Sequence, residues 1–478
     1  MGVLTVAALV LIGYGLATRR YDRALALAGV TAAGAAAVVG SVAVPTFYAV
    51  ASGLLVVLLA RYARGRSAGR RISIMAVPGA GLFLAFFAWA VLVTLVAPML
   101  FPGLVTVTPS GAELVAGHLT VSNIAQILYL GLSIGVVLLF AYTSSTGPQT
   151  LGLMLAVAML LSLWRYLGLH AGVPFPYGVF DNSPGFAYIE TAAGGIPRFR
   201  GIFSEPSALA GVALTAAVYS LARAVQVRGP WRLGNLVVAG IAIFLGIVST
   251  STTFVVVGAI MLGLAVVVVV GGFVSGRTGW PLGGVYVFLA MVVASVWVVP
   301  AAYEFVQAVL TEKVASDSYG ERSGADADSY QVFLDTFGFG VGLGSGRASS
   351  FFATLLSTTG YVGVLLFAAS VASVALPAVR IRAAQPVLWV LATTLIARFV
   401  SGPELTSTSG VMWMTLGVLA SMVMADREAR ASTESSALPP PPAPDDPDSR
   451  VPTSARSSPG AGRSAASSAA PAVTVSED

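Results

Sequence analysis

Long apolar runs separated by short polar segments cover most of the chain. A helix needs roughly 20 mainly apolar residues to cross a bilayer. The pattern therefore predicts an all-α, polytopic transmembrane helix bundle of about thirteen spans. The pair 24–40 and 44–61 is short and rich in Ala and Gly, and only a Ser/Thr turn separates 233–249 from 252–273. The predicted spans cover residues 2–18, 24–40, 44–61, 75–99, 121–142, 148–168, 202–222, 233–249, 252–273, 281–301, 350–378, 386–401 and 407–425.

The basic residues predict how the bundle is oriented. Cytoplasmic loops of membrane proteins carry an excess of Lys and Arg. If the N-terminus lies outside, the alternation of spans puts the arginine clusters between them on the cytoplasmic side. The C-terminus then also lies in the cytoplasm, and the chain is a multi-pass protein of the cell membrane. The clusters are 19–23, 61–71, 223–232, Arg277 and 380–382.

Two long loops and a tail lie outside the predicted spans. This topology places the loops 169–201 and 302–349 on the outer side. Most connectors are only a handful of residues long, and long loops often carry function. Residues 431–478 are rich in Ser, Pro and Ala and cannot bury enough apolar surface to fold. We therefore expect a membrane domain over 1–430 and a disordered cytoplasmic tail.

The composition excludes several classes of function. Of the 478 residues, 56% are hydrophobic and 10% are charged, whereas soluble domains carry about 25% charged residues. The net charge of +5 lies in short clusters between apolar runs, so we expect no nucleic-acid partner. The chain has no cysteine and only two histidines, His118 and His170. Thiolate chemistry is thereby excluded, and we expect neither a metal site nor a cofactor.

The first candidate site lies where the loop 169–201 enters the next span. Arg198 and Arg200 break the positive-inside pattern there, and Glu205 lies just inside the span. Arginine suits phosphate because it is permanently charged and offers a planar fork of donors. A carboxylate inside a span is a functional candidate by default. The alternative is that these arginines pair with Glu205 or reach toward lipid head groups.

The loop 302–349 holds a second set of candidates. It contains Glu321 and Arg322 among several aspartates, for which a solvated polar loop is the favoured interpretation. The run Gly338–Gly346 lacks the strand that a dinucleotide-binding motif requires. Glycines let backbone amides approach a ligand closely, and a helix start can bind an anion. We therefore predict an anion site at Arg347, with a flexible re-entrant turn as the alternative.

Arginines thus accumulate on the side where they should be scarce. Arg165 and Arg398 lie near the outer ends of their predicted spans. A set of arginines at the outer face indicates a polyanionic, pyrophosphate-bearing and lipid-linked ligand. The predicted outer arginines are Arg165, Arg198, Arg200, Arg322, Arg347 and Arg398.

At these residues the chain resembles the superfamily of O-antigen ligases and Wzy-like polysaccharide polymerases. One shared motif reads Arg198-Phe199-Arg200-Gly201-Ile202-Phe203, followed by Glu205-Pro206-Ser207. The other reads Gly340-Val341-Gly342-Leu343-Gly344, then Ser349-Ser350 and Gly360-Tyr361-Val362-Gly363. Order, spacing and topology agree over residues 120–425. Many ligases of the family carry His-Asn where this chain has Ser349-Ser350, so the resemblance favours an exopolysaccharide-polymerase-like variant.

The resemblance implies a membrane glycosyltransferase of GT-C-type architecture. Its donor would be a glycan on undecaprenyl pyrophosphate, and a hydroxyl of another lipid-linked repeat unit would attack at the outer face of the cytoplasmic membrane. Glu205 is then our first choice for the base and Glu321 our second. No metal or cofactor is needed, and the implied partners are membrane lipid and a chain-length regulator or flippase. The implied pyrophosphate and substrate ligands are Arg198, Arg200, Arg322, Arg347, Ser349 and Ser350.

Three alternatives remain. A ligase of the same superfamily would transfer the lipid-linked glycan to another acceptor. A lipid-linked oligosaccharide flippase or other transporter would be expected to show internal repeats and polar residues in the middle of many spans. We see no such repeat, and the intramembrane charges gather at the outer edge. A structural or sensory membrane protein would have no need of the outer arginines.

Overall fold

The computed structural model describes residues 2–39, 42–64, 73–107, 111–184, 188, 190, 198–274 and 317–437. For 39, 42, 62, 273–274, 317–322 and 434–437 it describes the backbone alone. The chain divides into a compact unit over Met1–Ala429 and a second unit over Arg430–Asp478. Of the second unit, the structure describes only 430–437, the last turns of a helix. All that follows concerns the first unit.

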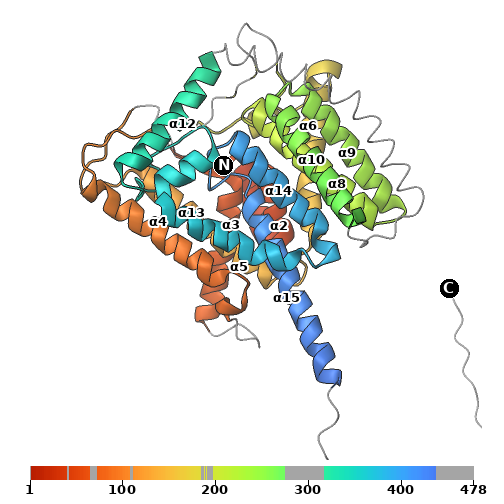
Figure 1. Cartoon of the computed structure of the whole chain (residues 1–478). Helices are drawn as coiled ribbons and strands as arrows, with labels where there is room; N and C mark the ends of the chain where they lie inside the picture. The colour runs from red at the N-terminus through yellow and green to blue at the C-terminus, as the bar shows by residue number, and fades with distance from the viewer. Residues whose placement is uncertain are drawn as a thin grey trace, which may run out of the picture. The chain divides into compact units, whose positions relative to one another are not determined.

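The first unit is mostly helical (Figure 1). Eight of its described helices are long and apolar enough to cross a membrane. Two shorter apolar helices, α1 (Val3–Thr18) and α3 (Thr46–Ala63), accompany them. The predicted polytopic membrane protein is therefore confirmed. The eight are α4 (Ala80–Leu100), α5 (Val121–Ala141), α6 (Pro148–Ala171), α8 (Pro206–Gln226), α9 (Pro230–Val248), α10 (Thr252–Val274), α13 (Phe351–Ala378) and α14 (Gln385–Val400), which is extended by the short helix η2 (Arg382–Ala384).

The predicted span 24–40 is wrong. Its residues form the short helix α2 (Tyr21–Gly29) and then the strand β1 (Ala35–Val39), which pairs antiparallel with β2 (Val42–Pro45). Glycine and β-branched valine favour helix less than alanine and leucine do, and valine suits a strand. A side chain from a distant loop also holds the strand edge. The Asn182 amide donates to the carbonyl oxygen of Ala35 at 2.9 Å and accepts from its N–H at 2.8 Å.

Helices also form inside the two predicted outer loops. The loop 169–201 contains the single turn α7 (Tyr177–Phe180), and the loop 302–349 contains α12 (Asp317–Asp335). The predicted turn between α9 and α10 is confirmed at 249–251. The predicted span 281–301 lies outside the described residues. A further short helix, η1 (Ile74–Ala76), precedes α4.

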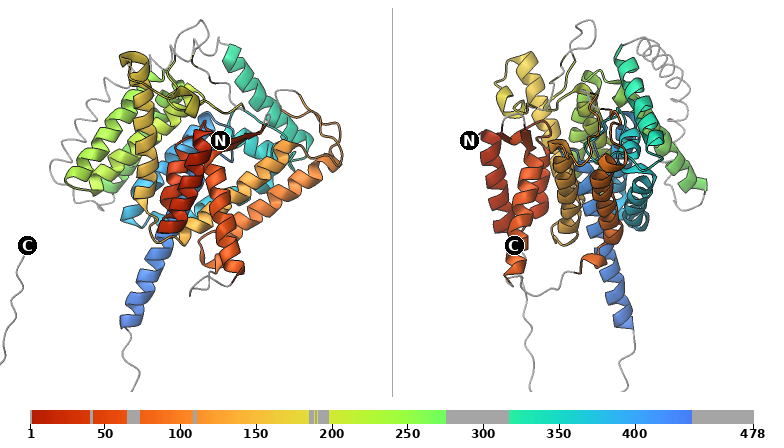
Figure 2. Two further views of the ribbon diagram at one scale, coloured as in Figure 1. Left: turned by 180° about the vertical axis from the view of Figure 1, so that it is seen from behind. Right: turned by 90° about the vertical axis from the view of Figure 1, so that its left-hand side faces the viewer.

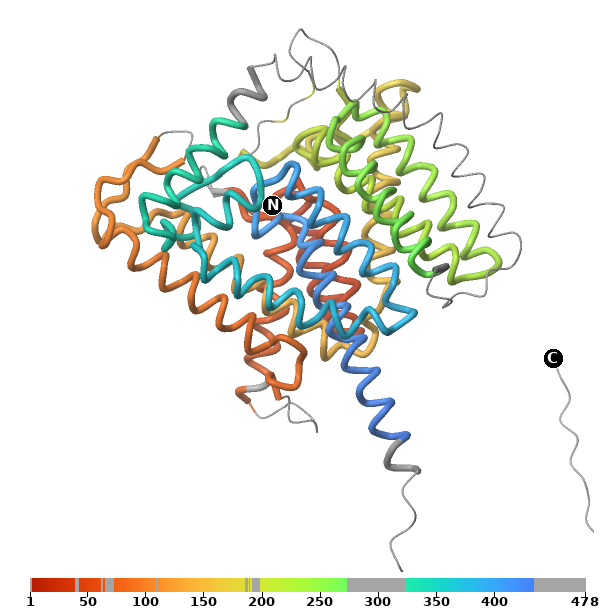
Figure 3. Tube along the Cα trace, viewed as in Figure 1, coloured from red at the N-terminus to blue at the C-terminus, as the bar shows by residue number. Residues whose placement is uncertain are grey.

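The first half of the helix α15 (Val411–Ala437) lies in the core instead of facing lipid, and the helix then continues past the other helices (Figures 1 and 3). Its first turns are fully enclosed by other helices, and its apolar part is too short to rank with the eight spans. The Trp413 indole lies 6.1 Å from the ring of Phe83 and 6.4 Å from that of Phe367, and it donates to the carbonyl of Leu405 at 3.0 Å. The core thus forms around α15, with α4 and α13 against it.

Short connections between antiparallel helices divide the unit into two ends. We call the first end the site end. Here α6, α9 and α14 finish, and α8, α10, α13 and α15 begin. At the opposite end, the α8–α9 and α13–α14 turns meet where the Gln226 amide donates to the carbonyl of Arg382 at 2.7 Å. We call this the basic end. The described arginines at this end include Arg19, Arg20, Arg23, Arg61, Arg64, Arg223, Arg228, Arg232, Arg380 and Arg382.

Segments far apart in the sequence are tied together at the site end. The Asn123 amide at the start of α5 donates to the carbonyl of Leu343 at 2.6 Å. The backbone N–H of Gly402, after α14, donates to the carbonyl of Ser349 at 3.3 Å. The β-hairpin also lies here, close to the start of α1 (Figure 2). These bonds bring the ends of several helices together around one cavity.

Candidate functional site

A cavity of about 410 Å³ opens at the site end. Its walls are mainly the first turns of α8 with the two residues before them, the last turns of α14 and the segment 401–411. Single residues from other segments, among them Thr253 and Arg347, complete the lining. This volume lies within the range of about 300–1,000 Å³ typical of small-molecule sites. Nine of the lining residues carry hydroxyl groups, and four are charged. The charged residues are Glu205, Arg347, Arg398 and Glu404.

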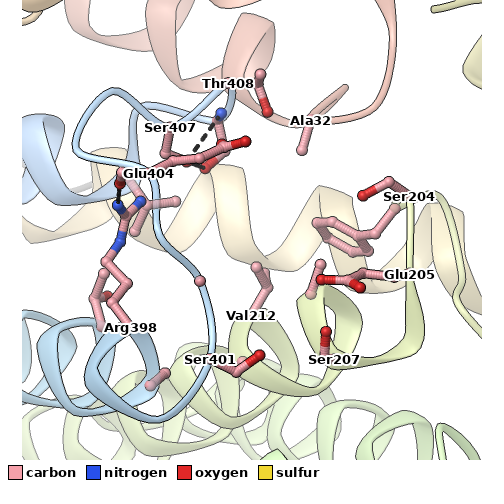
Figure 4. A pocket seen from close by; sticks show the side chains of 18 of the residues that line it. Ala32, Ser204, Glu205, Ser207, Val212, Arg398, Ser401, Glu404, Ser407 and Thr408 are labelled. Carbon is pink, nitrogen blue, oxygen red and sulfur yellow. Dashed lines mark hydrogen bonds between the residues drawn. The ribbon is translucent and has the colours of Figure 1, made fainter. Parts of the chain in front are cut away.

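Glu205 lies at the N-cap position of α8 and lines the cavity (Figure 4). A glutamate is too long to cap its own helix well, and its side chain makes no capping hydrogen bond. Pro206 occupies the first helical position, where its missing N–H costs nothing. The carboxylate therefore reaches into the cavity at the positive end of the α8 dipole.

Arg398 and Glu404 lie on the opposite side of the cavity from Glu205 (Figure 4). The Arg398 guanidinium donates to the backbone carbonyl of Glu404. Among the described residues, no carboxylate lies within ion-pairing distance of Arg398. The Glu404 carboxylate instead pairs with Arg347 at 3.2 Å, and both side chains are partly exposed at the mouth. The cavity thus places two cations and two carboxylates around a space that a ligand can enter.

A second group of charges lies outside the cavity and is fully paired. Arg165 and Arg200 are each 3% exposed and share the carboxylates of Asp181 and Glu190. Arg200 approaches Asp181 to 2.6 Å and Glu190 to 2.9 Å, and Arg165 approaches them to 2.9 and 2.6 Å. The Arg165 and Arg200 guanidinium groups also lie over aromatic rings, that of Arg200 4.8 Å from the ring centre of Tyr188. We call Arg165, Arg200, Asp181 and Glu190 the paired cluster.

The electrostatics of Asp181 show how tightly the paired cluster is held. Burial by itself would raise the pKa of the Asp181 carboxyl. Hydrogen bonds from Arg200 and Arg165, together with their positive charges, outweigh this and lower the pKa below its usual value. One Arg200 nitrogen also donates to the carbonyl of Phe203 at 2.6 Å, two residues before Glu205. The paired cluster therefore shapes the turn that presents Glu205.

The structure separates the two arginines of the first motif. Arg200 belongs to the paired cluster, while Arg198 is half-buried and donates to the carbonyl of Thr250 at 3.2 Å, in the turn between α9 and α10. Neither residue lines the cavity, whereas Glu205 of the same motif does. The motif therefore contributes a carboxylate to the cavity and uses its arginines to anchor the loop.

The predicted anion site at the glycine run is filled by groups of the protein itself. The N–H groups of Ser349 and Ser350 both donate to Asp326, at 2.7 and 2.9 Å. The Ser350 hydroxyl caps α13 by accepting from the N–H of Ala353. The backbone N–H groups of Val341 and Gly342 donate to carbonyls of α13, each at 2.9 Å. An aspartate in the preceding helix α12 thus binds the helix start that the sequence assigned to a ligand.

Close packing explains why this run needs glycine. Gly360 breaks α13 with a φ of 66°, and the run passes directly across the break. A β-carbon on Gly360 would lie 2.3 Å from the carbonyl oxygens of Gly338 and Phe339. A β-carbon on Gly342 would lie 2.6 Å from the backbone of Thr94 in α4. The glycines therefore permit contact between backbones, and only Arg347 at the end of the run reaches the cavity.

The remaining candidates stay outside the cavity. The side chains of Glu321 and Arg322, in the first turns of α12, lie outside the described residues. His118 is exposed, and exposed His170 packs against Tyr166 with ring centres 4.3 Å apart. Within the described ranges, no three His, Cys, Asp or Glu side chains lie close enough to hold a metal ion.

Sequence reasoning missed Glu404, the second carboxylate of the cavity. It follows α14 in Gly402-Pro403-Glu404, a turn sequence that gave no sign of its neighbours. Sequence reasoning also left Asp326 in a solvated loop. The residue is 24 positions before Ser350, so nothing in the local sequence marks it as the partner of that helix start. Arg398 was noted for its place near the outer end of a span, which is the signal that could have ranked it higher.

Comparison with known proteins assigns the chain to no family. No protein-family model matches it, and no curated protein matches it significantly. The features of the chain that bear on its function are therefore the geometry of the cavity and the two short motifs. What is established is a multi-pass membrane protein with a charged, hydroxyl-lined cavity at one end.

Proposed function

We propose that the chain is a membrane glycosyltransferase that joins undecaprenyl-pyrophosphate-linked repeat units of an envelope polysaccharide. The observation that supports this is the convergence of Glu205, Arg347 and Arg398 on one cavity. These residues lie at the start of α8, before α13 and near the end of α14, so the fold assembles them from three separate segments. A carboxylate facing cations is what transfer from a diphosphate donor needs.

The distribution of charge supports a location outside the cytoplasm. The basic end carries ten of the described arginines, as the cytoplasmic side of a membrane protein should. The cavity lies at the other end, so it faces the outer side of the cytoplasmic membrane. A GT-C-type architecture, an outer N-terminus and a cytoplasmic C-terminus belong to the same proposal. A chain-length regulator or flippase is the partner it implies.

The chemistry follows from the positions of the charges. Glu205 accepts the proton of an acceptor hydroxyl as its oxygen attacks the anomeric carbon of the donor. The bond from that carbon to the pyrophosphate oxygen breaks, and undecaprenyl pyrophosphate leaves with the electron pair. Arg398 stabilises the charge that develops on the leaving group, while Arg347, exposed at the mouth, helps to bind the diphosphate of the donor. Arg200 takes part as a positioning residue through its bond to Phe203.

The decisive experiment is chain extension by the purified protein in lipid nanodiscs supplied with lipid-linked repeat units. We expect Glu205→Gln to lower the rate by roughly 10²- to 10⁴-fold, the range for loss of a general base. Glu113→Gln, at an exposed position of the same end, is the matched control and should retain full activity. Full activity in Glu205→Gln would remove this residue from the mechanism.

The same assay separates the polymerase from its rivals. Transfer of the glycan to an acceptor other than a repeat unit, with no chain extension, would identify a ligase using the same cavity. Movement of intact lipid-linked oligosaccharide across a sealed membrane, with no new glycosidic bond, would identify a transporter. Either outcome would replace the proposal.

A further inference from the structure

Two hydroxyl groups in the cavity wall have no hydrogen-bond partner in the described part of the chain. They are Thr394 Oγ1 on α14 and Ser207 Oγ on α8, and both atoms are buried. Thr394 as a whole is 7% exposed. A buried hydroxyl without a partner costs folding free energy, so two on facing walls of one cavity call for an explanation.

The conformation of Thr394 is unusual for a threonine in an apolar helix of this protein. Such hydroxyls normally satisfy themselves by donating to the carbonyl four residues earlier. Thr94, Thr215, Thr393 and Thr415 all do so, at 2.6 to 2.8 Å. Thr393, the neighbour of Thr394, donates to the carbonyl of Trp389 at 2.7 Å. Thr394 makes no such bond, which leaves its hydroxyl available to whatever occupies the cavity.

The chemistry of this region excludes several occupants. The cavity extends from Glu205 to Thr215 along α8, a depth of about 15 Å at 1.5 Å per residue. Along α8, α10 and α14 the only charged lining residues are Glu205 and Arg398, and the others are apolar residues together with Ser207, Thr215, Thr253 and Thr394. A diphosphate would lie nearer to the arginines, and a hydrocarbon chain would leave the hydroxyls of Ser207 and Thr394 unsatisfied. A neutral, hydroxyl-bearing group fits.

We infer that this inner part of the cavity, between α8 and α14, is a subsite for a sugar ring. In it, Thr394 Oγ1 and Ser207 Oγ form hydrogen bonds with hydroxyl groups of the glycosyl residue attached to the diphosphate. The inference rests on the proposed function and adds how the substrate is recognised. A volume of about 410 Å³ suits the reacting end of a glycan, while the rest of the polymer stays outside.

The first test measures stability without substrate, so it does not depend on activity. Thr394→Val replaces the hydroxyl by a methyl group of similar shape and removes an unpaired polar atom. We expect the Tm of the purified protein to stay the same or to rise. Thr393→Val is the matched control: it removes a hydroxyl bonded to Trp389, and its Tm should fall. A fall in Thr394→Val at least as large as in the control would show that Thr394 already has a partner and would overturn the inference.

The second test measures affinity with two probes, undecaprenyl pyrophosphate and the same lipid carrying its repeat unit. The wild-type protein should bind the glycosylated lipid more tightly. Thr394→Val should weaken that binding by roughly three- to tenfold, the effect of one lost hydrogen bond. Its affinity for undecaprenyl pyrophosphate should not change. Ser207→Ala should behave in the same way, and Thr393→Val should change neither affinity.

The outcomes distinguish the subsite from the proposed function. If the wild-type protein binds neither lipid, the proposed function fails and the subsite with it. If it binds and extends the glycosylated lipid but Thr394→Val and Ser207→Ala bind it as well as wild type, only water occupies the subsite. The proposed function then stands and the inference is overturned.

Discussion

Two groups of arginines lie at the site end, and they differ in what surrounds them. In the paired cluster, Arg165 and Arg200 are almost completely buried and each contacts both Asp181 and Glu190. In the cavity, Arg347 is 59% exposed, and Arg398 is bonded to a backbone carbonyl. The first group has buried counter-ions within the protein. In the second group only Arg347 has a carboxylate partner among the described residues, and that pair with Glu404 is exposed, so both arginines remain accessible to an anionic ligand. The same residue type at the same end of the molecule thus has two uses.

The comparison shows how a structural cluster can support a site without lining it. Arg200 donates to the carbonyl of Phe203, and Glu205 follows in the same turn. A rigid, neutralised cluster can hold that turn in place because its charges are satisfied internally. Free charges at the same place would compete for the ligand. Substitutions in the two groups should therefore affect different measurements.

The largest effect is expected from Asp181→Asn. It leaves two buried arginines short of one counter-ion, and removing one partner of a buried ion pair typically costs about 3–5 kcal/mol. We expect a corresponding fall in the stability of the purified protein to thermal unfolding. Asp335→Asn, at an exposed position in α12, is the control and should stay within about 0.5 kcal/mol of wild type. Equal stability of the two variants would contradict the paired cluster.

Lowering the pH should reduce the stability of the wild-type protein for the same reason, without a mutation. The pKa of Asp181 is lower in the folded protein than in the unfolded chain. Its contribution is therefore complete above the unfolded value of about 3.9 and disappears as the pH falls through the lower folded pKa. The difference in Tm between wild type and Asp181→Asn should be constant near neutral pH and should shrink below about pH 4. A difference that grew in acid would reverse the sign assigned to Asp181.

Arg398→Gln should do the opposite of Asp181→Asn: it should lower the activity and leave the stability nearly unchanged. The glutamine can still donate a hydrogen bond but lacks the charge for the leaving group. Loss of one stabilising donor typically lowers kcat by about 10²- to 10³-fold. The Tm should change little, because no ion pair within the described part of the protein is broken. A drop in Tm comparable to that of Asp181→Asn would place Arg398 among the structural arginines.

Arg347→Gln should give the smallest effect. Its pair with Glu404 lies at the exposed mouth, where ion pairs contribute about 0–1 kcal/mol. We expect KM for the lipid-linked donor to rise by roughly two- to fivefold, with kcat nearly unchanged. The difference from wild type should decrease at high salt, because screening weakens exposed charges. A loss of kcat without a change in KM would place Arg347 closer to the reacting atoms.

The sequence predicted the membrane spans better than the contacts between them. A run such as 121–142 is apolar enough to require a lipid environment whatever its neighbours are, and it became α5. The prediction for 24–40 was wrong because its Ala/Gly composition permits helix or strand. Its contacts with β2 and Asn182 favour the strand in its second half. Glu205 could be singled out because a carboxylate beside a span is rare. Glu404 could not, since a glutamate in a Gly-Pro turn is ordinary until the fold places it beside Arg347 and Arg398.

By itself, the sequence determined that the chain is a multi-pass helical membrane protein, because a run of about 20 apolar residues favours a membrane-spanning helix whatever its neighbours are. It also determined that the arginines separate into two sets, because helices in alternating directions bring their ends to opposite sides. Only the tertiary structure decided which outer arginines are paired, because an ion pair requires two side chains within a few ångströms. It decided likewise that Asp326 binds the start of α13, and that Glu205, Arg347 and Arg398 share one cavity.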